Sequence, residues 1–324
     1  MRLLRGIGEA SLAPSIREVG SPLPRVMRPL GPRCRLVQFD SLLTDADFRR
    51  LTGFLERYPD VTLRAYGGYD GSIRNLDWLQ HFPRLRRFQV DALYELDDIA
   101  GLRHLPENLV ELGLGQTRKK LSLAGLQRFA GLRRLALEGH TKDIQAVSGL
   151  RQLADLTLRS VTLPDLSVLL PLWALRALDL KLGGTRDLSL LPELAPLRYL
   201  EIWQVRGLHD LTPVGEVESL EELVLQALKN VTVLPDMQRM GSLRWLHLET
   251  MKGLSDLAPL RQAPALEQVR LVDMPHLQPD ALAPLVGHPT LRAASIGLGS
   301  QRNNDRARHL VDLPPARWRS TRRS

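Results

Sequence analysis

One stretch of the chain decides its fold: residues 243–248 read Leu-Arg-Trp-Leu-His-Leu. The same pattern, Leu-x-x-Leu-x-Leu, returns along the chain at intervals of 21 to 25 residues, with Phe, Val, Ala or Ile in place of some of its later leucines. The first leucines of the pattern, which we call the anchors, are Leu85, Leu109, Leu132, Leu153, Leu175, Leu197, Leu220, Leu243, Leu266 and Leu291. A period of this size is typical of a solenoid, because a single repeat cannot bury its own apolar face and only stacking on a neighbour creates a core.

Each repeat combines a short strand with a short helical segment. Side chains alternate between the two faces of a strand, so the second and third leucines of the pattern point inward. A second apolar series follows with a spacing of three, as in residues 208–214 and 254–260, and this spacing is typical of one face of a 3₁₀ turn. The sequence therefore predicts an α/β solenoid: a right-handed array with a parallel concave β-sheet and short helical or 3₁₀ segments on the convex side.

The chain divides into four parts. They are a basic, proline-containing N-terminal arm (1–35), a strand–helix cap (36–60), about ten repeats (61–299) and an arginine-rich C-terminal tail (300–324). The prolines and glycines of residues 1–33 predict a loosely attached arm without regular structure. In the cap, Thr44 precedes the acidic Asp45 and Asp47, which predicts the start of a helix. Such a cap keeps the apolar end of the first repeat from water.

The formal charge of +8 is concentrated at the two ends of the chain. Residues 1–35 and 300–324 each carry seven arginines and two acidic residues, which leaves residues 36–299 with a net charge of −2. Any association with nucleic acid therefore belongs to the ends rather than to the repeats. Residues 317–323, Arg-Trp-Arg-Ser-Thr-Arg-Arg, could hold phosphates and stack on a base, or they could form a disordered, solubilising tail.

Composition limits the chemistry of the chain further. Cys34 is the single cysteine, which excludes an internal disulfide and a cysteine-rich metal site. The chain shows neither a signal-peptide core nor a run of the ~20 apolar residues that crosses a bilayer. We therefore expect a cytoplasmic protein with no membrane segment, no cofactor and no metal. Its core is aliphatic, because 44% of the residues are hydrophobic and only 5% are aromatic.

The repeats resemble those of a known class. The pattern at residues 243–248 continues at 253–260 as Gly-Leu-Ser-Asp-Leu-Ala-Pro-Leu, and residues 208–214 repeat its second half. Together they resemble the short leucine-rich repeats of the bacterial internalin-like class, and the resemblance implies a leucine-rich repeat protein. Members of that class stack an asparagine ladder eight residues after each anchor, whereas this chain has residues such as Leu93, Val205 and Met251 there, and it shows no export signal.

The concave face of the second half of the array holds the candidate binding site. Residues two and four places after each anchor, and the residue six places after it, face outward from the sheet. In this half they include large aromatic and charged side chains, which dominate binding hot spots. The candidate ligand-binding residues are Tyr199, Glu201, Trp203, Glu222, Trp245, His247, Glu249 and Arg270. We expect all three aromatics to be solvent-accessible, although they could instead cover aliphatic surface, with Trp203 stacked on Lys181.

Catalytic motifs are absent from the sequence. The histidines lie far apart, and only His247 falls on the concave face. The Gly-x-Gly triplets at 113–115 and 297–299 do not open a helix in a βαβ unit. We therefore expect a non-enzymatic scaffold that binds a peptide or protein on the C-terminal half of its concave face. The carboxylates of Asp179, Glu201, Glu222 and Glu249 favour a partner with apolar and basic character. The alternative is association with nucleic acid or an anionic surface through the arginine-rich ends.

Overall fold

The structure is a computed structural model that describes residues 15–68 and 70–317. The chain forms two compact units, Met1–Lys119 and Lys120–Ser324. Within each unit, parallel strands pair with their neighbours in the order in which they occur in the chain.

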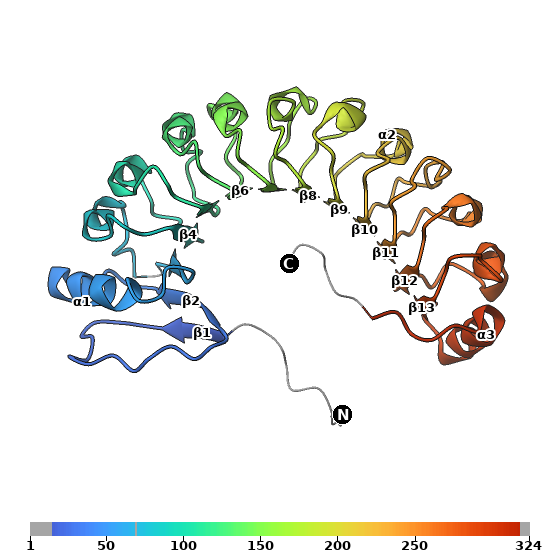
Figure 1. Cartoon of the computed structure of the whole chain (residues 1–324), viewed down its shortest axis with the longest axis horizontal. Helices are drawn as coiled ribbons and strands as arrows, with labels where there is room; N and C mark the ends of the chain where they lie inside the picture. The colour runs from blue at the N-terminus through green and yellow to red at the C-terminus, as the bar shows by residue number, and fades with distance from the viewer. Residues whose placement is uncertain (1–14, 69, 318–324) are drawn as a thin grey trace. The chain divides into compact units, whose positions relative to one another are not determined.

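Unit 1 contains the predicted cap and the first repeats (Figure 1). Its elements are β1 (Ser15–Glu18), β2 (Cys34–Phe39), α1 (Asp45–Leu55), β3 (Thr62–Tyr66), η1 (Asp77–His81), β4 (Arg87–Asp91), η2 (Ala100–His104) and β5 (Glu111–Leu114), where η denotes a 3₁₀ helix. Helix α1 begins as predicted, because the Thr44 side chain accepts a hydrogen bond from the Asp47 N–H at 3.2 Å. Phe48 and Leu51 of this helix are fully buried, which provides the apolar contact that the cap was expected to make.

The N-terminal arm is not entirely irregular. Residues 15–18 form β1, which pairs in parallel with β2 and whose Ser15 N–H donates to the Arg33 carbonyl. The loop that follows β1 is also fixed, since the Leu23 N–H donates to the buried carboxylate of Asp47 at 3.0 Å. The expectation of no regular structure up to residue 33 is therefore wrong for β1. Residues 1–14 lie outside the described residues.

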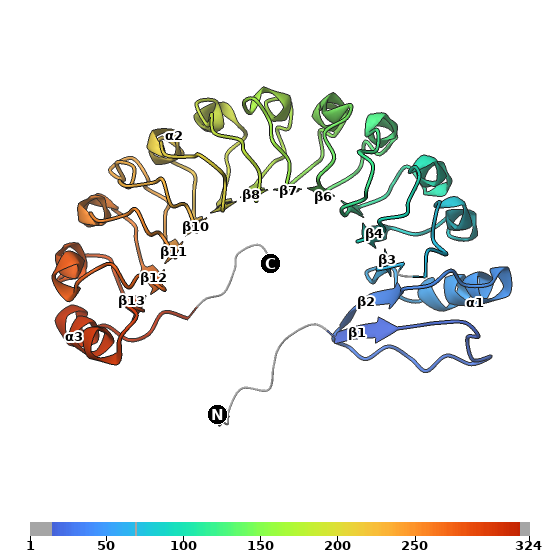
Figure 2. The same ribbon diagram turned by 180° about the vertical axis from the view of Figure 1, so that it is seen from behind.

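Unit 2 contains the remaining repeats (Figure 1). Its strands are β6 (Arg134–Glu138), β7 (Asp155–Arg159), β8 (Ala177–Lys181), β9 (Tyr199–Trp203), β10 (Glu222–Gln226), β11 (Trp245–Glu249), β12 (Gln268–Val272) and β13 (Ala293–Ile296). Its helices are η3 (Ala124–Arg128), η4 (Ile144–Gly149), η5 (Ser167–Leu169), η6 (Leu191–Glu193), α2 (Thr212–Gly215), η7 (Ala258–Gln262), η8 (Pro279–Leu285) and α3 (Gln301–Val311). Within this unit the strands form the inner layer of the curve and the helical segments form the outer layer, as Figures 1 and 2 both show.

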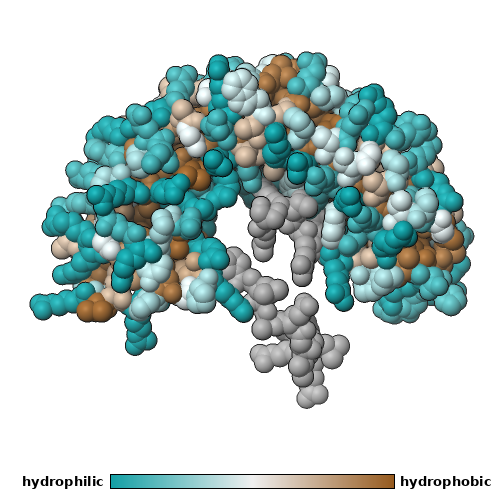
Figure 3. All heavy atoms as spheres, in the orientation of Figure 1, coloured by the Kyte–Doolittle hydropathy of each residue, from teal (hydrophilic) through white to brown (hydrophobic). Residues whose placement is uncertain are grey.

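The core of unit 2 lies between these two layers. Leu223 and Leu225 of β10 have no exposed surface, and neither does the anchor Leu220. From the outer layer, the series with a spacing of three is buried as well, with Leu254 and Leu260 at 0% exposure. Hydrophilic side chains cover most of the face drawn in Figure 3. The predicted α/β solenoid of parallel strands and short helical segments is thus confirmed.

The turn that leaves most strands of unit 2 starts with a left-handed residue. These residues are Ser160, Leu182, Gln204, Ala227, Thr250 and Asp273, with φ between 50° and 58°. A left-handed conformation costs a residue with a side chain roughly 1–2 kcal/mol. The turn continues the hydrogen-bond ladder in compensation: the Gln204 N–H donates to the Gln226 carbonyl, and the Ala227 N–H donates to the Glu249 carbonyl. Each of these hydrogen bonds therefore fixes the end of one strand relative to the end of the next strand.

The C-terminal part of the chain contains a helix where a tail was expected. Helix α3 starts at the N-cap Ser300, packs on η8 and β13, and buries Ala307 and Val311. Asp312 then adopts a left-handed conformation with φ 49°. The arginine-rich segment 300–324 is therefore helical in its first half, while residues 318–324, including most of the predicted phosphate-binding or disordered tail, lie outside the described residues.

Candidate functional site

The candidate site is the outward face of strands β8 to β12, all of which belong to unit 2. The strands are in register, so the outward residues form rows that run across the sheet. One row contains Ala177, Tyr199, Glu222, Trp245 and Gln268, the second Asp179, Glu201, Val224, His247 and Arg270, and the third Lys181, Trp203, Gln226, Glu249 and Val272. The sheet thus brings together all eight residues predicted from the sequence. We call this surface the acidic face.

Polar contacts on the acidic face converge on Glu201. The Tyr199 hydroxyl donates to Glu201 Oε2 at 2.8 Å, and Lys181 Nζ forms an ion pair with the same oxygen at 2.8 Å. Lys181 Nζ also lies 3.6 Å from Asp179 Oδ2. Burial acts to raise the pKa of Glu201. The hydrogen bond and positive charge of Lys181 and the hydrogen bond from Tyr199 outweigh burial, so the pKa of Glu201 is lowered.

Tyr199 is buried, which corrects the expectation that all three aromatics are accessible. Its exposed fraction is 6%, and it packs with Ala177 and Val224 in a small apolar cluster on the acidic face. Both neighbours are small aliphatic residues on the adjacent strands, against which the tyrosine ring can pack. Burial raises the pKa of the Tyr199 hydroxyl, and the carboxylates of Glu201 and Asp179 raise it further. Tyr199 therefore remains a hydrogen-bond donor.

Trp203 and Trp245 are partly exposed, as expected for rings that could contact a ligand. The guanidinium of Arg159 lies over the Trp203 ring at 5.3 Å from its centroid. The stacking of Trp203 on Lys181, the alternative considered from the sequence, is replaced by this cation–π contact, because Lys181 is bound to Glu201.

His247 lies beside an acidic residue. Its Nε2 atom is 2.9 Å from Glu249 Oε2, and its side chain is in register with Arg270 on β12. Only 8% of His247 is exposed. Burial lowers its pKa, and the charge of Arg270 lowers it further, against the opposing effect of Glu249 and Glu201.

Carboxylates outnumber cations across the acidic face and the adjoining β7. The strands β7 to β12 present Asp155, Asp179, Glu201, Glu222 and Glu249 outward, against Arg159, Lys181 and Arg270. Glu222 and Asp179 are 0% and 1% exposed, whereas Glu201 and Glu249 are partly exposed. Such an arrangement can accept hydrogen bonds from cationic groups while the aromatic rings provide apolar contact.

Strand β7 belongs to this surface, although the sequence analysis gave it no binding role. Thr157 Oγ1 donates to Asp179 Oδ2 at 2.7 Å, and Arg159 covers Trp203. The alternation of side chains that identified the outward residues of β8 to β12 also places Asp155, Thr157 and Arg159 on the outward face. The sequence therefore already indicated that these residues of β7 lie beside the charged residues of β8, and this was the available signal for a role in binding.

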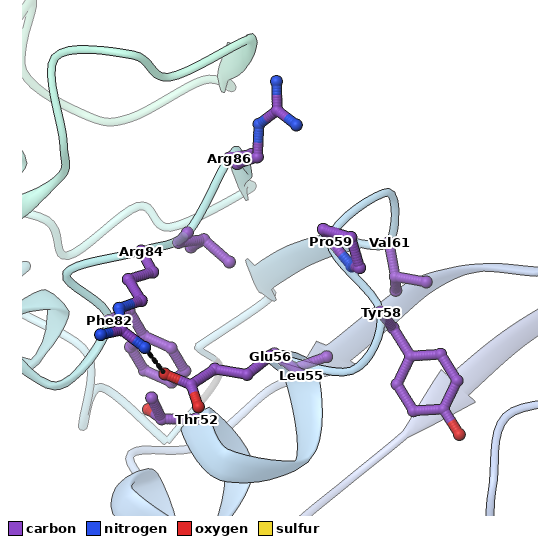
Figure 4. Close-up of a pocket in the computed structure, with 10 residues that line it drawn as sticks. Thr52, Leu55, Glu56, Tyr58, Pro59, Val61, Phe82, Arg84 and Arg86 are labelled. Atoms are coloured by element: carbon purple, nitrogen blue, oxygen red, sulfur yellow. Dashed lines mark hydrogen bonds and ion pairs between the residues drawn. The ribbon is translucent and has the colours of Figure 1, made fainter.

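Other parts of the molecule offer little chemistry. Among the described residues, there is no group of three or more His, Cys, Asp or Glu residues that could hold a metal ion. In the same residues, no helix is both long and apolar enough to span a membrane. Unit 1 has a cavity of about 390 Å³ in which Arg84 Nη1 lies 3.3 Å from Glu56 Oε1 (Figure 4). None of the predicted site residues lines this cavity.

The chain is similar to several solved structures of leucine-rich repeat proteins. No family model matches it, and no curated protein matches its sequence. Among solved structures, internalin C2 of Listeria monocytogenes is 19% identical over 79% of this chain and 84% of its own, with a TM-score of 0.38. Internalin F of the same organism is 17% identical over 86% and 90%, with a TM-score of 0.43. The leucine-rich repeat domain of the type III effector XopL is 19% identical over 70% and 72%, with a TM-score of 0.42.

The class of the protein follows from its own repeats. Each strand carries inward leucines, pairs in parallel with its neighbours and is followed by a short helical segment or turn. This arrangement is that of a leucine-rich repeat solenoid. The structural neighbours are internalins and other leucine-rich repeat proteins.

Proposed function

We propose that the protein is a non-enzymatic binding module whose acidic face captures a peptide or protein segment with basic and apolar side chains. The observation that carries the proposal is the combination, on one sheet, of carboxylates in excess over cations with the partly exposed rings of Trp203 and Trp245. Arginine and lysine side chains satisfy both features, because their charged heads pair with carboxylates and their stems and planar groups stack on aromatic rings.

The acidic face is pre-organised for such a ligand. Tyr199, Lys181 and Glu201 hold one another by hydrogen bonds and an ion pair, and the backbone ladder fixes the strands beneath them. Fixed groups lose little conformational entropy on binding, which increases affinity. Glu201, whose pKa is lowered, is also only partly exposed, so water screens its charge less than it would screen a fully exposed carboxylate.

A display experiment tests this function. The protein is immobilised and used to select from a library of random short peptides, and the selected sequences are compared with those selected by a variant carrying Glu201→Gln and Glu249→Gln. We expect the native protein to enrich arginine or lysine near an aromatic or aliphatic residue, and the variant to lose that enrichment. Selection of acidic or purely apolar peptides by the native protein would contradict the proposal.

Other expectations from the sequence stay predictions. The alternative of binding nucleic acid through the ends depends largely on residues 1–14 and 318–324, which lie outside the described residues. The division into arm, cap, repeats and tail, and the cytoplasmic location, are likewise kept as proposals.

A further inference from the structure

The last described residues lie on the strand face of unit 2. After the left-handed Asp312, the Pro314 carbonyl accepts a hydrogen bond from the Ala294 N–H of β13 at 2.9 Å. The Ala316 N–H donates to Ser295 Oγ at 3.0 Å. The Arg317 N–H then donates to Gln268 Oε1 of β12, also at 3.0 Å. Because Ser295 and Gln268 are outward residues, the chain has turned back from α3 and crosses the sheet from β13 to β12.

We propose that residues 317–324 of this chain bind in cis to the acidic face and act as its built-in ligand. The proposal rests on the proposed binding site and assigns an occupant to it. An external partner would then compete with the chain's own segment, so the apparent affinity for that partner would be the intrinsic affinity multiplied by the fraction of molecules in which the site is free.

The segment is long enough to reach the carboxylates. Neighbouring strands lie about 4.8 Å apart, so Glu222 on β10 is about 10 Å from the position of Gln268 on β12, and Asp179 on β8 is about 19 Å away. The seven residues 318–324 can span about 23 Å when extended. The direction is also suitable, since the step from Ser295 to Gln268 already leads toward β11 and β10.

The residue types of the segment match those of the surface. Residues 317–324 read Arg-Trp-Arg-Ser-Thr-Arg-Arg-Ser, with four arginines and no acidic residue. The guanidinium fork of arginine pairs with carboxylates through two hydrogen bonds. The strands on the path present Glu249, Glu222, Glu201 and Asp179, and the partly exposed ring of Trp245 offers a contact for Trp318.

Tethering favours this segment over the same sequence supplied by another molecule. A short linker gives an effective concentration on the order of millimolar, so even a weak individual interaction leads to high occupancy. Here the linker is already ordered up to Arg317, which the hydrogen bond to Gln268 holds at the edge of the acidic face.

Limited trypsin digestion of the full chain tests the proposal. Trypsin cleaves after arginine, so we follow cleavage after Arg319 and Arg322 by mass spectrometry and compare it with a synthetic peptide of residues 317–324. We expect cleavage in the full chain to be slower by tenfold or more, with a rate constant independent of protein concentration. Cleavage at the rate of the free peptide would overturn the proposal, and so would protection that grows with protein concentration, because that result indicates binding between molecules.

Charge variants locate the binding surface. The double variant Glu201→Gln and Glu249→Gln should restore fast cleavage, whereas Glu193→Gln, an equivalent change at an exposed position of η6, should leave cleavage slow. Melting curves show whether each variant is folded. If the double variant does not fold, a chain that stops at Arg317 provides the second test. It should bind the fluorescent 317–324 peptide at least tenfold more tightly than the full chain does, and equal binding would overturn the proposal.

The outcomes separate this proposal from the proposed function. A shortened chain that selects basic peptides, combined with an unprotected segment in the full chain, supports the function and overturns cis binding. Protection of the segment in the full chain, combined with no selection of basic peptides by the chain that stops at Arg317, supports cis binding and overturns the function.

Discussion

Glu201 shows how single residues set the chemistry of the acidic face. Lys181 and Tyr199 lower the pKa of Glu201 against the effect of burial, so this carboxylate stays charged at neutral pH. Burial, together with the charges of Glu201 and Asp179, raises the pKa of Tyr199, so its hydroxyl stays protonated and keeps donating. Glu201 is thus held in place by two partners and presents a charged carboxylate on the acidic face.

Trp245 is the residue whose loss should separate binding from stability. We expect Trp245→Ala to weaken binding of a display-selected peptide roughly thirtyfold, the equivalent of about 2 kcal/mol for an aromatic hot spot, with little change in melting temperature. Trp173→Ala is the matched control, because Trp173 is 60% exposed and follows η5 in the outer layer, away from the strand face. Isothermal titration measures both affinities, and an unchanged affinity for Trp245→Ala would exclude this ring from the site.

His247 should make stability depend on pH. Its pKa in the folded protein is below the ordinary value of 6.5 because of burial, so the unfolded chain binds a proton first as the pH falls. His247 therefore contributes a loss of stability as the pH falls through about 6.5, and the loss levels off below the folded pKa. We expect the free energy of unfolding of the native protein, minus that of His247→Gln, to decrease between about pH 7.5 and pH 5 in urea titrations.

The comparison with His247→Gln removes other contributions to the pH dependence. Burial also lowers the pKa of His288, but this histidine is present in both proteins, so its effect cancels. A difference that stays constant with pH, or that increases as the pH falls, would show that the folded protein does not disfavour protonated His247.

At the scale of elements, each strand and the turn after it act as one unit. The alternation of side chains and the anchor spacing were sufficient to predict which residues face outward, and the observed register confirms those rows. The burial of Tyr199 could not be predicted in the same way, because it depends on Ala177 and Val224, which lie on other strands. Alternation determines the direction of a side chain, whereas its neighbours in space determine its exposure.

The left-handed turn after β10 supplies the test at this scale. Ala227 has φ 53°, a conformation that is strongly unfavourable for a β-branched side chain and accessible to glycine. We expect Ala227→Val to lower the free energy of unfolding by about 1–2 kcal/mol, and Ala227→Gly to leave it within about 1 kcal/mol of the native value. Urea denaturation measures both, and an equal effect of the two substitutions would show that backbone strain at this turn is small.

At the scale of the whole chain, the repeats were predictable and the ends were not. The repeats can be detected in the sequence because they share one periodic pattern. By contrast, β1 contains only one large apolar residue, Ile16, which is 55% exposed. Helix α3 buries only Ala307 and Val311 among arginines and polar residues. Both elements are held by tertiary contacts that leave no periodic signal in the sequence.

The C-terminal helix should therefore be part of the stable fold. In a chain that stops at residue 299, the contacts of Ala307 and Val311 with the last repeat are lost, and so is the hydrogen bond from the Leu298 N–H to Asn304 Oδ1. Burial of these two side chains alone accounts for about 2–4 kcal/mol, so we expect a lower free energy of unfolding of this order. A chain that stops at Arg317 is the control. It keeps α3 and the contacts of Pro314 and Ala316, so it should lose only the binding of the cis segment, about 1.4 kcal/mol for a tenfold protection. Urea denaturation compares the three chains, and equal stability of the shortest one would show that α3 does not cap the solenoid.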